Sequence, residues 1–330
     1  MASDDGGSAP FRSRGRARCS LRFWSKRNPR GERSLNSPLF MPTKAVLHCV
    51  VCNDMMENWL DEDIWRCGNC AHWTSTFSTT TANNESNELD EVHRHAALQE
   101  LRLGNAVKIL DEILSRVEVD KPTLCDVGTA YGWFLSLSQK AGIDSIGIEP
   151  DQNVAQVAIQ QGIPVRVGEF PQCLSTSEQF DVLTFNDVFE HLSEPAQVLA
   201  ACRSHLHARG LLVIVLPSSR GILFRIAYQL RRFGMRRPWD RLWQRSFPCP
   251  HRHYYSPTGL EAILQGVGFQ LELKTDLPSF HYRGLWNRIL MDSKVSIVRA
   301  TLSYFALLAV SPVIRLGRSD ITMHIFRAPT

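Results

Sequence analysis

The strongest constraint on this 330-residue chain is a glycine-spaced turn that joins a predicted strand to a predicted helix. Residues 124–135 read LCDVGTAYGWFL: an apolar strand that contains Asp126, a turn, and an amphipathic helix that begins near Tyr131. Gly128 and Gly132 carry no Cβ atom, so the backbone of the turn can approach a ligand closely. Ala130 stands where a third glycine would be expected. The stretch predicts a strand–turn–helix unit that holds a ligand against its backbone.

An acidic residue follows this turn at an informative distance. A second strand is predicted over residues 144–148 and ends at Glu149, 23 positions after Asp126. In nucleoside-binding α/β folds, a carboxylate about 20 residues after a glycine-rich turn accepts the ribose hydroxyl groups. The turn and Glu149 together therefore indicate a nucleoside site.

The chain around the turn alternates between strand-like and helix-like patterns. Further strands are predicted over residues 164–167, 180–185, 210–217, 269–274 and 320–326, and helices over 131–140, 151–161 and 194–207, with Asp151 as a helix cap. This alternation predicts an α/β fold with a doubly wound, mostly parallel seven-stranded sheet. Ligands of such sheets bind at the carboxyl ends of the strands.

Two Cys-x-x-Cys pairs precede this region. Such pairs suit tetrahedral zinc, and four cysteine ligands leave no open coordination position, so the ion would be structural. The sequence predicts a small zinc ribbon over residues 45–75, and the alternative is four reduced cysteines in a core. A partner or a substrate could contact the ribbon. The predicted ligands are Cys49, Cys52, Cys67 and Cys70.

Basic residues are concentrated at the N-terminus. Residues 1–40 hold nine Lys or Arg and three acids, whereas the whole chain has a formal net charge of +4. The remainder is slightly acidic, which argues against a body that coats nucleic acid. Residues 1–40 are predicted to be a disordered tail; a transit peptide or a translation start at Met41 are the alternatives. No apolar secretory segment follows the basic residues, so we expect a cytoplasmic protein with reduced cysteines.

Three segments flank or interrupt the predicted core. Residues 76–118 are expected to form a linker and N-terminal helices. Residues 219–255 form a basic aromatic insert with nine arginines and one acid. It is a solvated basic helix whose aromatics pack on the core, or it is a substrate lid or a surface for an anionic head group. Residues 293–314 predict an apolar helix with too short an uncharged run to span a bilayer. It is a core or interface helix, or it lies peripherally on a membrane surface.

In combination, these motifs resemble the class I S-adenosylmethionine-dependent methyltransferases over roughly residues 123–273. The similarity is strongest to the bacterial branch that has small-molecule, lipid or sugar acceptors. It implies a Rossmann-like methyltransferase domain over residues 119–330, whose strand 320–326 is the antiparallel edge strand. The residues that carry the resemblance read DVGTAYG at 126–132, GIEP at 147–150, FDV at 180–182, DVFEHL at 187–192 and SP at 256–257.

The resemblance implies S-adenosylmethionine as the cofactor and gives it a site. The two oxygens of Glu149 would accept the ribose hydroxyls, and the glycine turn would form the floor under methionine and ribose. Residues 168–170 would lie beside the adenine, and the end of strand 180–185 would approach the methionine. The implied cofactor residues are Asp126, Gly128, Thr129, Ala130, Gly132, Glu149, Glu169, Phe170, Asn186 and Asp187.

Methyl transfer to an oxygen or carbon acceptor requires a group that removes a proton. Imidazoles ionise near neutral pH, and His191, His251 and His253 are the catalytic candidates expected on the acceptor side. The alternative for each is a structural histidine that orients a loop. That alternative is stronger for His191, because Glu190 and His191 open a predicted helix. A metal site at this Glu-His pair lacks further ligands at a useful spacing.

The predicted function is O- or C-methylation of a small-molecule, sugar or lipid-linked acceptor. One alternative is a zinc-ribbon interaction protein on a methyltransferase-like scaffold. The other is an RNA methyltransferase, which the ribbon and the arginines favour. The chain reads Asn-Asp-Val-Phe at 186–189, not the Asn/Asp-Pro-Pro-Tyr type of motif that recognises amide-bearing acceptors, so nucleic acid is not the expected partner.

Overall fold

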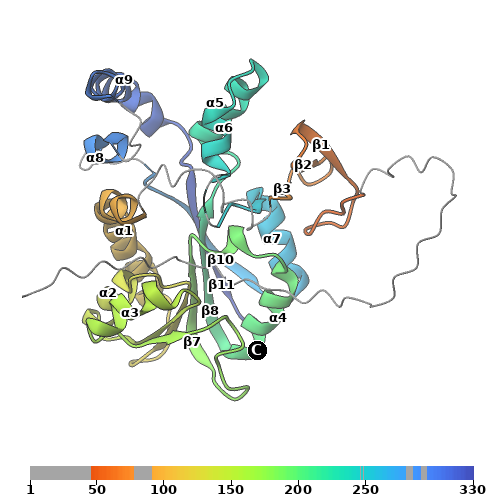
Figure 1. The fold of residues 1–330 in the computed structure, drawn as a ribbon. Coiled ribbons are helices and arrows are strands. Elements are labelled where there is room, and N and C mark those ends of the chain that lie inside the picture. Colours follow the sequence, from red (N-terminus) through yellow and green to blue (C-terminus); the bar gives the residue numbers. More distant parts are fainter. Residues whose placement is uncertain (1–45, 78–90, 246, 248, 280–284, 291–295) are drawn as a thin grey trace, which may run out of the picture.

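The computed structural model describes residues 46–77, 91–245, 247, 249–279, 285–290 and 296–330. The predicted N-terminal tail and most of the predicted linker lie outside the described residues. Around a central sheet, helices cover both faces, and a smaller sheet packs beside it (Figure 1).

The central sheet has seven strands in the order β10-β11-β8-β7-β4-β5-β6. The five strands from β4 to β8 are parallel, and β11 is antiparallel to both of its neighbours. The predicted α/β fold with a mostly parallel seven-stranded sheet is therefore confirmed. The strands are β4 (Thr123–Val127), β5 (Asp144–Glu149), β6 (Val165–Val167), β7 (Phe180–Asn186), β8 (Leu206–Pro217), β10 (Gln270–Leu277) and β11 (Ile321–Arg327).

The prediction that the last strand lies at the edge of the sheet is wrong. β11 is inserted between β8 and β10, and β10 is the edge strand. Burial explains the order, since residues 322–327 are all buried, whereas β10 alternates between exposed and half-buried positions until Leu277. A strand that is paired on both sides and covered on both faces reads as a continuous run, and a half-exposed strand alternates.

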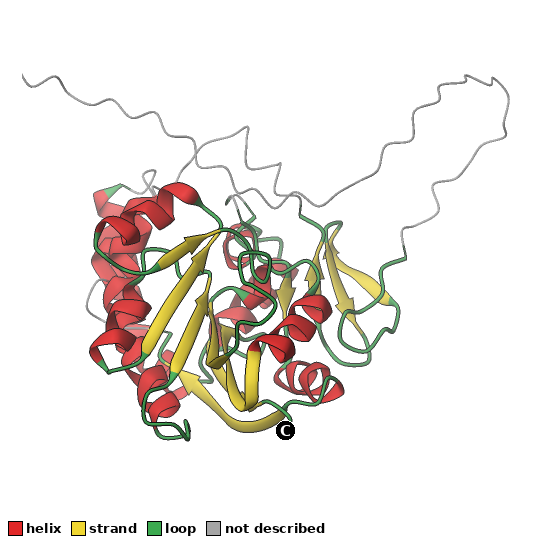
Figure 2. Cartoon of the chain, turned by 90° about the horizontal axis from the view of Figure 1, so that it is seen from below, coloured by secondary structure: helices red, strands yellow, loops and turns green. Residues whose placement is uncertain are grey.

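Two helical layers sandwich the sheet (Figures 1 and 2). On one face lie α1 (Glu91–Leu114), α2 (Trp133–Lys140) and α3 (Gln152–Gln160), whose apolar residues form one core with the strands. On the other face lie α4 (Pro195–His205) and α7 (Pro257–Gly266), with a second core that includes Leu199, Leu260 and Leu264. Parallel strands joined through helices on the two faces of the sheet give this doubly wound arrangement.

The start of α3 agrees with the prediction, whereas α2 begins later than predicted. Asp151 caps α3 as predicted, because its Oδ1 accepts hydrogen bonds from the backbone N–H groups of Asn153 and Val154. α2 begins at Trp133, two residues after the predicted start. Ala130 and Gly132 are left-handed, with φ of 49° and 74°, so the first helical turn cannot include them.

The second sheet contains four strands in the order β1-β2-β3-β9. The first three belong to the cysteine-rich segment, here called the ribbon (residues 46–77): β1 (Met56–Asp61), β2 (Ile64–Cys67) and β3 (Trp73–Ser75). The fourth, β9 (His253–Tyr254), comes from the end of the basic aromatic insert and pairs with β3. The ribbon is thus completed by a strand that lies far away in the sequence.

The aromatic residues of the insert pack against the ribbon. The insert forms α5 (Ile222–Arg232) and α6 (Arg237–Leu242). Trp239 and Trp243 are fully buried, and the ring of Trp73 makes edge-to-face contacts with Phe224 and Trp239 at centroid distances of 5.7 and 5.8 Å. Phe77 meets Trp243 in the same way. These contacts form one cluster across the two segments.

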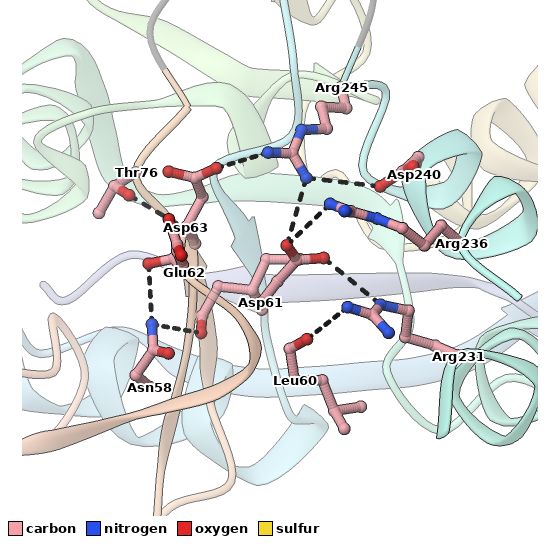
Figure 3. A network of polar contacts seen from close by, with 11 residues as sticks. Asn58, Leu60, Asp61, Glu62, Asp63, Thr76, Arg231, Arg236, Asp240 and Arg245 are labelled. Carbon is pink, nitrogen blue, oxygen red and sulfur yellow. Dashed lines mark hydrogen bonds and ion pairs between the residues drawn. The ribbon is translucent and has the colours of Figure 1, made fainter. Parts of the chain in front are cut away.

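Ion pairs join the same two segments (Figure 3). Asp61, whose side chain is 6% exposed, lies 3.2 Å from Arg236, 3.4 Å from Arg245 and 3.5 Å from Arg231. Arg245 also pairs with Asp63 at 2.6 Å, and Arg231 donates to the carbonyl oxygen of Leu60. Three of the nine arginines that suggested a surface for an anionic head group are therefore partners of ribbon acids.

The C-terminal apolar segment is helical, as predicted. α8 (Leu285–Leu290) precedes α9 (Ile297–Leu316), and the two helices pack together. Among the described residues, no helix combines the length and the apolar character needed to cross a bilayer. One face of α9 is apolar and exposed, with Ile297, Val298, Leu302 and Phe305 each more than 60% accessible.

Candidate functional site

The glycine turn lies at the carboxyl end of β4, where the sequence placed it. Gly128 is left-handed, with φ of 73°, and a Cβ atom there would lie 2.5 Å from a methyl group of Val188. Any side chain would force the turn away from the segment after β7. Ala130 keeps a left-handed conformation without being glycine, which costs about 1 kcal/mol, and its backbone N–H is bound by a carboxylate.

That carboxylate is Glu149, the last residue of β5. Its Oε2 accepts a hydrogen bond from the Ala130 N–H at 2.9 Å, and its Oε1 accepts one from the Asp151 N–H at 3.0 Å. Each oxygen of a carboxylate can accept a second hydrogen bond. Burial raises the pKa of Glu149, against the lowering effect of the two N–H donors. The acid is therefore held in one orientation, with acceptor capacity left for a diol.

Asp126 lies deeper than the resemblance implies. It is 2% exposed, and its Oδ1 accepts hydrogen bonds from the hydroxyl of Thr184 at 2.5 Å and from the amide of Asn186 at 2.9 Å. Burial raises the pKa of Asp126 to about 6. Asp126 thus fastens β4 to the end of β7. The Oδ1 atom of Asn186 is buried and has no hydrogen-bond partner within the described structure.

The remaining residues that the sequence predicts for the cofactor site lie at the same end of the sheet. Thr129 is buried, and its backbone N–H joins that of Gly128 on the carbonyl oxygen of Ile148. Asp187 is left-handed and lies 3.7 Å from Arg102 of α1, which reaches over from the helical layer. No motif in the sequence pointed to Arg102.

The segment predicted to lie beside adenine follows β6. The backbone N–H of Gly168 donates to the carbonyl oxygen of Glu149, so this segment adjoins the acid. Glu169 is half-buried. The Phe170 ring packs edge-to-face against Phe185 and His205, each at 5.8 Å, so it also belongs to the core.

Two of the three candidate bases meet beside the turn after β7. A short 3₁₀ helix, η2 (Phe189–His191), places Glu190 and His191 there, and the loop before β9 brings His251 to them. The Nε2 atoms of both histidines lie 3.9 Å from Glu190 Oε1, and the imidazole centroids are 4.8 Å apart. Burial and the nearby Asp187 carboxylate raise the pKa of Glu190 well above its ordinary value.

His253 takes a different position. Its Nδ1 atom lies 3.1 Å from His72 Nε2 and 3.3 Å from the Thr74 hydroxyl, both in the ribbon. Burial lowers the pKa of His253 to about 4, so the ring is neutral at physiological pH. The structure joins His191 and His251 with Glu190, so the expectation that the Glu-His pair lacks further ligands is wrong. It places His253 against the ribbon. The only available signal for Glu190 was the DVFEH run followed by a distant His-x-His.

The four predicted cysteine ligands converge. Cys49 Sγ lies 3.5 Å from Cys70 Sγ, Cys52 Sγ lies 3.4 Å from Cys67 Sγ, and all four sulfur atoms lie within 4.8 Å of one another. These separations are too long for a disulfide and close to the ~3.8 Å between thiolates bound tetrahedrally to one zinc ion. Burial raises the pKa of Cys49 to about 11, so its thiolate needs a cation nearby. The residues fit a zinc ion.

A cavity of about 520 Å³ lies between the ribbon and the insert. Three arginines line it together with the rings of Trp73, Phe224 and Tyr228, and no acidic residue is among its lining. The guanidinium of Arg66 lies over the Trp73 ring at 5.5 Å. The other two arginines, Arg220 and Arg225, follow the carboxyl end of β8.

A family profile described as "Methyltransferase domain" matches residues 93–274, more than half of the chain. No curated protein matches the chain.

Solved structures with a similar fold have low identity. A SAM-dependent methyltransferase from Archaeoglobus fulgidus is 16% identical, with a TM-score of 0.43, and the match covers 70% of this chain and 97% of that one. A cyclopropane synthase from Mycobacterium tuberculosis is 17% identical, with a TM-score of 0.47 and coverages of 67% and 83%. The magnesium protoporphyrin IX methyltransferase from Synechocystis is 12% identical, with a TM-score of 0.47 and coverages of 76% and 92%. On the family match, this chain belongs to the methyltransferase domain family.

Proposed function

We propose that this protein transfers a methyl group from S-adenosylmethionine to a small-molecule, sugar or lipid-linked acceptor. The observation that carries the proposal is Glu149, which is fixed by two backbone donors and retains acceptor capacity beside a glycine turn. The unpartnered Oδ1 of Asn186, at the end of β7, also fits a polar ligand. Family membership supplies the class of reaction.

Different residues of the site would bind different parts of the cofactor. Glu149 would accept the ribose hydroxyls, and the backbone of residues 128–132 would lie against the ribose and methionine. Asn186 and Asp187 would approach the methionine end. When bound, S-adenosylmethionine supplies an activated methyl group on a sulfonium. The protein's part is to hold the acceptor in line with that methyl group and, for an oxygen or carbon acceptor, to take its proton.

The arginine-lined cavity supports an acceptor that carries an anionic group such as phosphate. Guanidinium groups bind phosphate in a bidentate manner, and the neighbouring rings suit an apolar or sugar moiety. Arg231, Arg236 and Arg245 already pair with ribbon acids, which leaves less basic surface for RNA. The exposed apolar face of α9 supports peripheral contact with a membrane, which flotation with lipid vesicles would test.

We also propose that Cys49, Cys52, Cys67 and Cys70 hold a structural zinc ion. Four thiolates leave no position for substrate, so the ion would stabilise the ribbon and take no part in the reaction. The convergence of the four sulfur atoms supports this assignment.

Calorimetric titration with S-adenosylhomocysteine tests the cofactor site. We expect the parent protein to bind it and Glu149→Gln to bind it about tenfold to a hundredfold more weakly, since a charged hydrogen-bond acceptor is lost. Glu118→Gln is the matched control, because Glu118 is an exposed carboxylate that pairs with Arg209 away from the site. Equal affinity in the parent and in Glu149→Gln would refute the assignment. Transfer of a labelled methyl group to phosphorylated acceptors and their dephosphorylated forms would then test the acceptor class.

A further inference from the structure

The cluster of Glu190, His191 and His251 has the features of a metal site. All three come from segments that meet at the carboxyl end of β7, and their ligand atoms lie within 4.8 Å of one another. Glu190 is 1% exposed, and its Oε2 has no hydrogen-bond partner in the described part of the chain. A buried carboxylate with an unused oxygen is costly unless a cation or a proton balances it.

Hydrogen bonds fix which ring nitrogen of His191 carries the proton. His191 Nδ1 lies 3.0 Å from the carbonyl oxygen of Pro250. A carbonyl oxygen only accepts, so Nδ1 is the donor, and in the neutral imidazole Nε2 carries the lone pair. That Nε2 lies 3.9 Å from Glu190 Oε1.

Hydrogen bonds also place the proton of His251 on Nδ1. The Tyr254 hydroxyl donates to the carbonyl oxygen of Leu242 at 2.9 Å, so its oxygen accepts the hydrogen of His251 Nδ1 at 3.3 Å. His251 Nε2 therefore also carries a lone pair, and it too lies 3.9 Å from Glu190 Oε1. The amide nitrogen of Gln244 donates to this lone pair at 2.7 Å and is the group that a cation would displace.

The distances suit one ion. A separation of 3.9 Å is too long for a hydrogen bond and about 0.5 Å longer than the ~3.4 Å between two atoms that each lie about 2.1 Å from the same tetrahedral ion, so a small side-chain shift would bring both atoms onto one metal. Histidines that donate from Nδ1 to a backbone or hydroxyl oxygen and ligate through Nε2 are the usual arrangement in metal sites. Two imidazoles and one carboxylate form a ligand set for first-row divalent metals with coordination positions left open.

We propose that Glu190, His191 and His251 bind a divalent first-row metal ion beside the methyl-transfer site, separate from the cysteine cluster. The ion's open positions would take an oxygen atom of the acceptor and orient it. This role in the reaction rests on the proposed function, whereas binding of the ion does not.

Electron paramagnetic resonance with Mn²⁺ tests the site in the zinc-loaded full-length protein. Thiolate ligands prefer zinc over Mn²⁺, so the cysteine cluster should not interfere. We expect one Mn²⁺ per chain in the parent and an affinity at least about tenfold lower in Glu190→Gln, because loss of even an outer-shell partner costs about that much. His191→Asn provides a second variant at a partly exposed position. His207→Gln, an exposed histidine on β8, is the matched control and should bind like the parent.

Each outcome decides the proposal. Parent protein that takes up neither Mn²⁺ nor zinc beyond the cysteine-bound ion would overturn it, as would unchanged Mn²⁺ affinity in folded Glu190→Gln and His191→Asn. Titration with S-adenosylhomocysteine separates the two proposals: Glu190→Gln should lose Mn²⁺ and keep cofactor binding. A parent that binds Mn²⁺ through these residues but no cofactor would support the metal site and remove its proposed role.

Discussion

At the scale of single residues, the site is organised by buried acids. Asp126 fastens β4 to β7, Glu149 fixes the glycine turn, and Glu190 faces two imidazoles. Burial raises the pKa of all three carboxyl groups. Burial makes the charged form of each of these three carboxyl groups unfavourable. Such groups are common at functional sites.

Asp126 should make stability depend on pH. Its folded-state pKa of about 6 is above its ordinary value of 3.8, so its contribution to stability is present below pH 3.8 and is lost as pH rises through 6. Between pH 5 and pH 7.5 the parent should therefore lose about 1 kcal/mol relative to Asp126→Asn, which cannot ionise. Urea denaturation of both proteins at the two pH values measures the difference. A gap that does not widen toward pH 7.5 would contradict the assignment.

At the scale of elements, the insert and the ribbon behave as one unit. An aromatic cluster and the ion pairs of Asp61 hold α5 and α6 against β1 and β2 (Figure 3). The arginine-lined cavity lies in this contact, so its shape depends on the ribbon as much as on the methyltransferase domain.

Asp61→Ala should loosen this contact. The change leaves three guanidinium groups close together without their shared carboxylate, and loss of one partner from a buried ion pair costs about 3 kcal/mol. Denaturation followed by tryptophan fluorescence reports on the contact, since Trp239 and Trp243 lie in it. Glu57→Ala, an exposed acid on the same strand, should change stability by less than about 0.5 kcal/mol. Equal stability of the two variants would show that the arginines do not need Asp61.

The sequence predicted most of the sheet, because its strands are apolar runs separated by recognisable turns and caps. It failed where the determining contacts are distant in sequence. β10 lies at the edge because β11, and not β10, pairs with β8. Glu190 meets His251 only because a loop some 60 residues further along the chain folds back to it. The pairing of Asp61 with arginines of the insert likewise has no local signal. The Cys-x-x-Cys pairs could be recognised from the sequence because the two cysteines of each pair are close together in the chain.

At the scale of the whole molecule, two sheets share the chain. The ribbon supplies three strands of the smaller sheet and the insert supplies the fourth, so neither segment completes it alone. Unfolding of the ribbon should therefore destabilise the insert as well. The central sheet should stay folded, because its strands belong to separate hydrophobic cores.

Removal of the proposed zinc tests this coupling. Cys67→Ser should release the ion, lower the thermal midpoint, and speed hydrogen exchange in β9, α5 and α6 as well as in the ribbon. Exchange in β4, β5 and β7 should stay close to that of the parent. Cys173→Ser, a half-buried cysteine outside the cluster, is the control. Faster exchange confined to residues 46–77 would mean that the two segments are independent.

The pairing of β3 with β9 also bears on synthesis. A ribosome releases the ribbon early, yet β3 has no partner on that side until residues 253–254 emerge with most of the central sheet already made. Until then β3 presents an open edge, the kind of surface on which chains aggregate. Because that edge closes late, a chain that stops before residue 253 would carry the cysteine-rich ribbon with the β3 edge still unpaired.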